Sequence, residues 1–288
     1  MTNGFTFTQF YILSSLNPKE EYTANDLFKY IETERSNNGY DFELTHAKFQ
    51  GIDQLQLIIK KINEQTLTGQ IPLIHFECHG DPLDGLFFKD GTEIKWEILF
   101  EIITEINISS KFNLFVGLAA CFGLNFIDKM NPVRPSPCWA VIAPVNEVDP
   151  GEVISGFRNF YGVLLRTGSV NEANRALKSA QGAWYMNNAE AWYYGCIKNY
   201  IETHCTPQAL EPMISARHSQ LLESGRNVSL LQIKENFMKH QLNYLTHKFF
   251  DQYFSTHVIP ENKHRFANVQ NITQKLISDL RETGKYWI

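Results

Sequence analysis

The first two thirds of the chain alternate short apolar runs with longer segments whose apolar residues recur at helical spacing. The apolar runs have the length and the β-branched and aromatic content of strands, and they cover residues 4–13, 40–49, 72–78, 113–119 and 138–144. The segments of helical spacing lie between and after them, at residues 25–35, 52–66, 96–106 and 150–164. This alternation predicts the α/β class, with a mostly parallel sheet between two layers of helices in an α/β/α sandwich.

The last part of the chain has a different pattern. Residues 207–288 show helical periodicity and little strand signal, and the change begins at Thr206-Pro207. We therefore expect two domains, an α/β domain over residues 1–205 and an all-helical C-terminal lobe over residues 206–288. The apolar stripes of this lobe form either its core or a surface that binds a partner or a second copy.

Turn and capping residues mark further boundaries in the α/β domain. Asp90-Gly91 is typical of a hairpin turn, so residues 86–94 are predicted to form a hairpin. Ser169 and Glu172 have the spacing of a capping box and predict the start of a helix. Asp149, followed by Pro150, predicts another helix N-terminus.

Composition limits the compartment and the partners. The net charge is −5 and no long basic run occurs, so we expect neither nucleic acid nor an anionic membrane as the main partner. The longest uncharged apolar stretch, residues 112–127, has 16 residues, which is shorter than the roughly 18–20 that cross a membrane. The N-terminal residues lack the pattern of a secretory signal, and the five scattered cysteines do not form a disulfide framework. These features predict a cytoplasmic protein with reduced thiols.

Two of the apolar strands end in side chains that can do chemistry together. His79-Gly80 follows strand 72–78, and Ala120-Cys121 follows strand 113–119. Because sites in parallel sheets form at the carboxyl ends of strands, we expect the His79 imidazole and the Cys121 thiol at one sheet edge. An imidazole beside a cysteine favours the nucleophilic thiolate. The backbone N–H groups of Gly80 and Cys121 are the candidate donors of an oxyanion hole.

These segments resemble the catalytic motifs of a known peptidase clan. Ile74-His-Phe-Glu-Cys-His79-Gly80 and, 42 residues after His79, Leu118-Ala-Ala-Cys121-Phe-Gly resemble the motifs of clan CD cysteine peptidases, the caspases, metacaspases, separases and gingipains. The bacterial CHAT peptidases are the most similar branch. The order of the motifs and the segments 85–91 and 140–144 fit the same pattern, and the resemblance covers roughly residues 70–180.

The resemblance implies a caspase-like fold and a cysteine endopeptidase that needs no metal or organic cofactor and cleaves a protein or peptide. It implies that His79 and Cys121 form the catalytic dyad and that Gly80 and Cys121 form the oxyanion hole. In this clan the region after strand 140–144 helps to bind the residue before the scissile bond, so Glu147 and Asp149 are candidate substrate-binding residues that favour Arg or Lys. Bacterial relatives act in stress or antiphage defence, which implies a regulated effector with an activating sensor or partner.

Three alternatives to this peptidase remain open. His75, Glu77 and His79 share a strand face and, with Cys121 or Cys138, include zinc-ligand types, although no CxxC or HExxH spacing supports a metal site. A glutamine amidotransferase or α/β-hydrolase also uses a strand-end nucleophile, but residues 119–123 lack the first glycine of its elbow motif and its His follows the nucleophile. The last alternative is a catalytically idle caspase-like scaffold that binds a partner through its helical tail.

Overall fold

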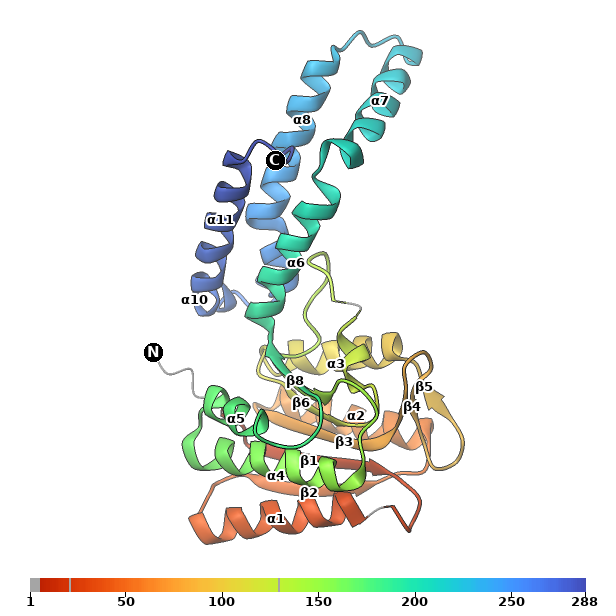
Figure 1. The fold of residues 1–288 in the computed structure, drawn as a ribbon, viewed down its shortest axis with the longest axis vertical. Helices are drawn as coiled ribbons and strands as arrows, with labels where there is room; N and C mark the ends of the chain where they lie inside the picture. The colour runs from red at the N-terminus through yellow and green to blue at the C-terminus, as the bar shows by residue number, and fades with distance from the viewer. Residues whose placement is uncertain (1–5, 21, 129) are drawn as a thin grey trace. The chain divides into compact units, whose positions relative to one another are not determined.

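The computed structural model describes residues 6–20, 22–128 and 130–288, and Figure 1 shows its ribbon. Two compact units make up the chain. The first contains Met1–Lys129 and Pro137–Asn188, and the second contains Met130–Ser136 and Ala189–Ile288. Of the predicted strand 4–13, Gly4 and Phe5 lie outside the described residues.

A mixed sheet forms the centre of the first unit. Its main path has the order β2-β1-β3-β6-β7-β8. The strands are β1 (Gln9–Ser15), β2 (Glu43–Lys48), β3 (Pro72–Asp81), β6 (Phe115–Ala119), β7 (Ala140–Pro144) and β8 (Trp184–Asn188). The strands from β2 to β7 pair in parallel, and β8 pairs antiparallel with β7. The prediction of an α/β fold with a mostly parallel sheet is confirmed.

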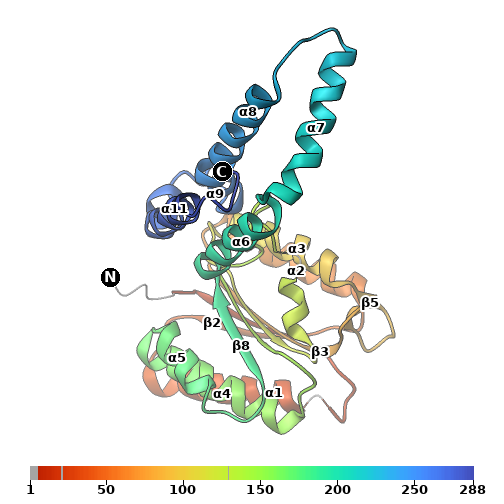
Figure 2. The same ribbon diagram turned by 45° about the horizontal axis from the view of Figure 1, so that its top comes forward.

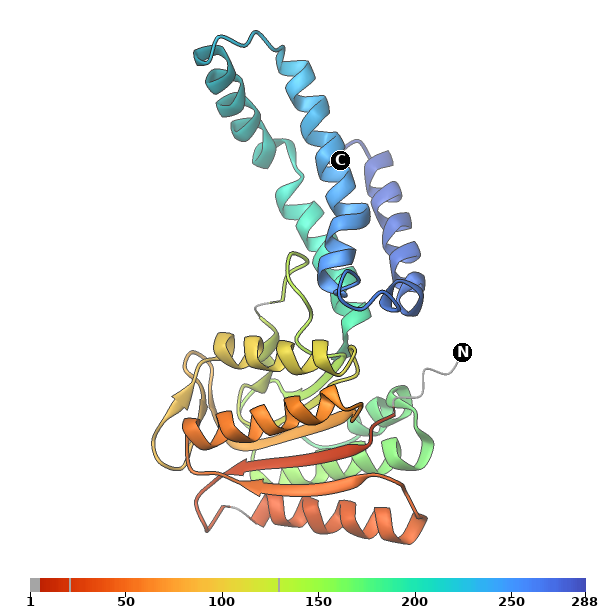
Figure 3. The ribbon, with the colours of Figure 1, turned by 180° about the vertical axis from the view of Figure 1, so that it is seen from behind.

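Helices cover both faces of this sheet, as Figures 1 and 3 show. One face carries α1 (Tyr22–Asn38), α4 (Pro150–Thr167) and α5 (Val170–Leu177), and the other carries α2 (Ile52–Leu67) and α3 (Trp96–Ser109). The strands are apolar on both sides because both sides are covered: Phe10, Phe76 and Phe115 are fully buried. This arrangement is compatible with the predicted α/β/α sandwich.

The predicted turn and caps are formed in the first unit. The strands β4 (Gly85–Phe87) and β5 (Glu93–Ile94) make the hairpin and extend antiparallel from the end of β3. Ser169 begins α5 by accepting the Glu172 N–H at 3.3 Å. Strand β8 has no counterpart among the predicted strands, because Asn187 and Asn188 belong to a residue type that is depleted in strands.

The second unit is helical, as predicted for the C-terminal part of the chain. Its helices are α6 (Ala189–His204), α7 (Pro207–Glu223), α8 (Leu230–Asn243), the π-helical turn η2 (Tyr244–Lys248), α9 (Phe249–Tyr253), α10 (Asn262–Arg265) and α11 (Ala267–Glu282). The helices α7 and α8 form an antiparallel hairpin, which Figure 2 shows from the side. An aromatic core lies inside this unit. The ring centroid of Phe254 is 5.2 Å from that of Tyr193 and 4.3 Å from that of Phe266. No helix in the described part of the chain has the length and hydropathy of a bilayer-crossing segment.

The division between the units falls between Asn188 and Ala189, whereas the sequence pattern predicts a boundary after residue 205. The helix α6 packs against α11 and so belongs to the second unit. Helical periodicity shows which residues of α6 are apolar, but it does not show which partner they pack against. The second unit also holds Met130–Ser136, and within it the Ser136 N–H donates to the Tyr253 carbonyl at 3.1 Å.

Candidate active site

The strands β3 and β6 end at the same edge of the sheet. They pair in parallel, and the last residues in register are Glu77 and Ala119. His79 and Cys121 each follow two positions later, so the common register carries both residues to this edge. The backbones meet there, because a Cβ added to Gly80 would lie 2.2 Å from the Cys121 carbonyl oxygen. The structure therefore brings the segment of the predicted base against the segment of the predicted nucleophile.

A pocket of about 430 Å³ lies over this contact. Its lining residues in the described chain are Gly80, Asp81, Cys121, Phe122, Glu147, Val148 and Asp149. Four of the five residues predicted for the site thus line one pocket, while His79 precedes the lining residue Gly80 and is not itself part of the lining. Cys121 is half-buried, and its Sγ lies 3.9 Å from the Val148 carbonyl oxygen.

The other four thiols lie in less reactive surroundings. Burial raises the pKa of Cys78 and of Cys138, both of which are inside the first unit. Burial also raises the pKa of Cys196 and of Cys205 to about 11, in the second unit. A thiol with a raised pKa is a poor nucleophile at neutral pH, because the thiolate is the reactive form. None of these four cysteines lines the pocket of Cys121.

The chain turns sharply directly after Cys121. Phe122 has a φ of +56°, in the left-handed region that residues with a side chain rarely adopt. Two hydrogen bonds hold this turn: the Phe122 N–H donates to the Asn146 carbonyl at 3.1 Å, and the Gly123 N–H donates to the Ala120 carbonyl at 3.1 Å. Strained conformations of this kind persist where the surrounding structure fixes them, and they are concentrated at functional sites.

His79 is paired with a residue that the sequence analysis did not identify. Its Nε2 lies 3.1 Å from Oε2 of Glu20, and the two side chains are 56% and 46% exposed. The hydrogen bond with His79 is the largest cause of a lowered pKa at Glu20. Because Glu20 occupies Nε2, the Nδ1 of His79 is the ring nitrogen left to exchange a proton with a thiol or a substrate. Nothing near Glu20 in the sequence signals this role, since the pairing arises only because β1 lies next to β3.

The two acidic residues predicted for substrate binding line the pocket and differ in their other contacts. The Asp149 Oδ1 accepts the Glu152 N–H at 2.9 Å, and the Glu152 Oε2 accepts the Asp149 N–H at 3.2 Å, which is the predicted helix cap. Glu147 is exposed and its carboxylate has no hydrogen bond or ion pair within the described residues. Asp81 adds a third carboxylate, whose Oδ1 accepts the N–H groups of Leu83 and Asp84. Since three carboxylates and no cation are among the described residues that line the pocket, it favours a positively charged group.

The side chains that could ligate zinc, those of His75, Glu77 and His79, lie in different surroundings. The side chains of His75 and Glu77 are buried and contact each other, with His75 Nε2 3.1 Å from Glu77 Oε1. His79 is more than half exposed and contacts Glu20 instead. Across residues 6–20, 22–128 and 130–288, no three His, Cys, Asp or Glu side chains come together as a group that could hold a metal ion.

A scan against protein-family models finds no match for this chain, and a search of curated proteins finds none either. A function is therefore inferred from the arrangement at the sheet edge. This arrangement consists of the half-buried Cys121 at an acidic pocket and the backbone of Gly80, which contacts the backbone of Cys121. His79, which precedes Gly80 on β3, is paired with the carboxylate of Glu20.

Proposed function

We propose that this chain is a caspase-like cysteine endopeptidase, similar in its motifs to the bacterial CHAT peptidases. The main support is the direct contact between the Gly80 and Cys121 backbones beside a pocket that both residues line. That contact joins the two segments whose sequences resemble the catalytic motifs of the clan.

In the proposed reaction the Cys121 Sγ attacks the carbonyl carbon of the scissile peptide bond, and the thiol proton passes to Nδ1 of His79. The carbonyl oxygen becomes an oxyanion, and the N–H groups of Gly80 and Cys121 donate to it. When the C–N bond breaks, His79 returns the proton to the leaving amine and a thioester remains on Cys121. Water then attacks the thioester and gives a proton to His79. The C–S bond breaks, the acid is released, and the proton on His79 returns to the Cys121 thiolate.

Glu20 has a clear place in this scheme. When Nδ1 takes the thiol proton, the ring of His79 becomes positively charged. A carboxylate that accepts a hydrogen bond from Nε2 stabilises this charge and fixes the orientation of the ring. The 3.1 Å contact between His79 and Glu20 has the geometry for both effects.

The substrate class follows from the charge of the pocket. Asp81, Glu147 and Asp149 line it, and among them the carboxylate of Glu147 is the one without a competing contact. We therefore propose that the residue before the scissile bond is Arg or Lys, with Glu147 as its main partner. A survey of cleavage sites in a proteome, comparing the natural chain with Cys121→Ala, tests this substrate class. Cuts after apolar or acidic residues would contradict it.

The catalytic assignment is tested by labelling with a peptidyl electrophile that carries Arg next to its reactive group. We expect labelling of the natural chain and its loss in Cys121→Ala and in His79→Ala. Cys196→Ala is the matched control, because Cys196 is also half-buried but lies in the second unit and has a raised pKa. Equal labelling of the natural chain and Cys121→Ala would refute the assignment.

The second candidate, a scaffold that binds a partner through the helical unit, is favoured by a groove between α7 and α8. This groove has a volume of about 460 Å³. Leu221, Ile233 and Phe237 make it apolar, and Arg217 and His240 line it as well. No acidic side chain is among its lining residues in the described chain. An acidic amphipathic helix is therefore the partner that fits best.

A pair of peptides tests the groove. A helical peptide of Glu and Leu should bind the full chain more tightly than its Lys and Leu counterpart. Arg217→Gln should weaken this binding, whereas Lys239→Gln, which removes an equal charge from α8 outside the groove, should leave it unchanged. Equal binding of both peptides would contradict the partner site.

A further inference from the structure

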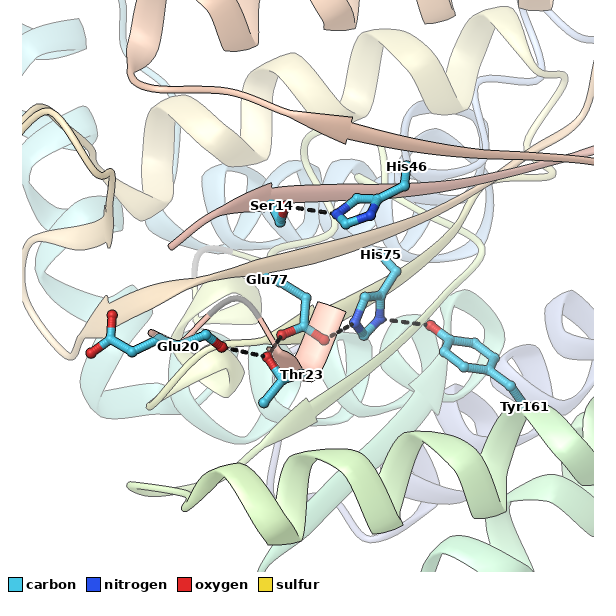
Figure 4. Close-up of polar contacts among 7 residues, drawn as sticks. All are labelled: Ser14, Glu20, Thr23, His46, His75, Glu77 and Tyr161. Atoms are coloured by element: carbon cyan, nitrogen blue, oxygen red, sulfur yellow. Dashed lines mark hydrogen bonds and ion pairs between the residues drawn. The ribbon is translucent and has the colours of Figure 1, made fainter. Parts of the chain in front are cut away.

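A chain of buried polar side chains lies inside the first unit, next to the proposed dyad. His75 and Glu77, both on β3, are 0% and 2% exposed. Tyr161 from α4 lies 3.1 Å from His75 Nδ1, and Thr23 from α1 donates to Glu77 Oε2 at 2.7 Å. With the 3.1 Å contact between His75 and Glu77, these bonds link helices α4 and α1, which lie on one face of the sheet, through β3 beneath them (Figure 4).

The hydrogen bonds along this row of buried side chains all run toward Glu77. Burial, and then the charge of Glu77, raises the pKa of Tyr161, so its hydroxyl keeps its proton. In the His75 tautomer whose ring proton is on Nε2, this hydroxyl donates to Nδ1. In the same tautomer Nε2 donates to one oxygen of Glu77. Thr23 donates to the other oxygen. Every side-chain polar atom that takes part has a partner, and this satisfies buried groups that would be costly if left unpaired.

The neighbouring strand β6 leaves room for these hydrogen-bonded side chains. Gly117 of β6 lies opposite His75 in the sheet register. A Cβ at Gly117 would lie 2.3 Å from the Tyr161 hydroxyl oxygen and 2.7 Å from His75 Nδ1. The bond between Tyr161 and His75 therefore depends on the absence of a side chain on β6, the strand that leads to Cys121.

Thr23 joins the buried chain to the exposed pair at the site. Its Oγ1 is 2.7 Å from Glu77 but 3.4 Å from the Glu20 carbonyl, so its one hydroxyl proton goes to Glu77. Its backbone N–H donates to that Glu20 carbonyl at 3.4 Å. Asn17 also donates to the Glu20 carboxylate, at 3.1 Å, and the Glu20 N–H donates back to the Asn17 carbonyl at 2.9 Å. The turn that carries Glu20 is thus held to β3 through Thr23.

The position of the buried carboxylate supports a role at the site. Glu77 lies two residues before His79 on β3, so their side chains leave the strand on the same face. Burying a charged carboxylate costs free energy, because the charge is removed from water. An orienting role explains the placement of a carboxylate there better than a gain in stability does.

We propose that Glu77, acting through Thr23, is a positioning residue that holds the Glu20 turn so that Glu20 orients His79. This inference rests on the proposed function for its catalytic consequence, but the geometry that it describes does not depend on peptidase activity. The buried chain from Tyr161 to Thr23 keeps the Glu77 carboxylate in place. Glu77 then fixes Thr23, and Thr23 fixes the backbone of Glu20.

The test uses Thr23→Val, which removes the hydroxyl and keeps the shape of the side chain. Thr33→Val is the matched control, because Thr33 lies on the same helix, is exposed and donates only to the Lys29 carbonyl of that helix. Thr23→Ser restores a hydroxyl and should restore the natural behaviour. The first measurement is the NMR titration of the Glu20 carboxyl group in the full chain. We expect its lowered pKa to return toward its ordinary value of 4.5 in Thr23→Val but not in Thr33→Val.

The second measurement is peptide cleavage. We expect kcat to fall by about tenfold in Thr23→Val with KM unchanged, because the substrate pocket is intact and the imidazole is misplaced. Glu77→Gln should act in the same direction, and thermal unfolding of each variant separates misplacement from loss of the fold. An unchanged Glu20 titration in Thr23→Val would overturn the proposal. A changed titration in a chain that cleaves no peptide would support the positioning and refute the proposed function instead.

Discussion

Gly80 faces the carbonyl oxygen of Cys121 so closely that a methyl group on Gly80 would lie 2.2 Å from it. The obstacle is backbone, so no side-chain rotation relieves the clash. We expect Gly80→Ala to push the two strand ends apart, to lower the free energy of unfolding by about 1–3 kcal/mol and to lower kcat/KM by about a hundredfold. Peptide cleavage and urea unfolding measure the two effects. Gly195→Ala is the control, since a Cβ on Gly195 of α6 meets nothing within 4 Å, and unchanged cleavage in Gly80→Ala would contradict the expected role of this contact.

The pairing of Glu20 with His79 predicts that the free energy of unfolding depends on pH in the acidic range. The pKa of Glu20 is lowered in the folded protein, so this carboxylate stabilises the fold above its ordinary pKa of 4.5, and the contribution is lost as the pH falls through the lowered value. Because the pair is exposed, we expect the natural chain to exceed His79→Ala by only a few tenths of a kcal/mol near pH 6. Urea unfolding from pH 6 to pH 2 should show this difference shrinking, whereas a difference that grows toward low pH would have the wrong sign. The exposed His257 gives the control variant His257→Ala.

The two acidic residues of the pocket should respond differently to substitution. Glu147→Gln should raise KM for substrates with Arg before the scissile bond and leave the melting temperature unchanged, because within the described residues the carboxylate of Glu147 has no hydrogen bond or ion pair to lose. Asp149→Ala should lower the free energy of unfolding by about 1 kcal/mol, because Asp149 caps α4. Steady-state kinetics and thermal unfolding of both variants check this separation. A Glu147→Gln variant with unchanged KM would remove Glu147 from the substrate site.

Gly117 and Tyr161 should be coupled energetically. Gly117→Ala should lower the free energy of unfolding by about 1–3 kcal/mol, because its Cβ would meet the Tyr161 hydroxyl. Tyr161→Phe removes that hydroxyl and leaves His75 Nδ1 without this partner, so it should also destabilise the protein, by about 1–3 kcal/mol. In the double variant the total loss should be smaller than the sum of the two single losses, because the clash with the Tyr161 hydroxyl is absent and only the close approach to His75 Nδ1 remains. Chemical unfolding of the four chains measures this coupling, and strict additivity would argue against it.

Much of the first unit can be predicted from the sequence, because the strongest signals in this part of the chain are local. The apolar runs ending at His79 and near Cys121 are read directly from the chain, and parallel pairing then brings their ends to one edge. The cap at Asp149 and the hairpin around Asp90-Gly91 are local for the same reason. Both are features that neighbouring residues determine.

The features that could not be predicted from the sequence depend on contacts between residues that lie far apart along the chain. Glu20 meets His79 across 59 positions, and Tyr161 meets His75 across 86. No periodicity or motif encodes such pairs, since they follow from which strands lie side by side. The division at Asn188 has the same origin, because α6 is assigned by its packing against α11.

The segment Met130–Ser136 affects how the chain can be divided. A chain shortened to end at Asn188 would keep all the strands of the sheet but would lose Tyr253, to which the Ser136 backbone donates. It would also lose Cys196, whose Sγ lies 3.9 Å from the Met130 carbonyl. The connection between η1 (Gly123–Ile127), which follows Cys121, and β7, which leads to Glu147, would then lose these two contacts at its middle. The helical residues are thus part of what a shortened chain has to include to keep this segment in place.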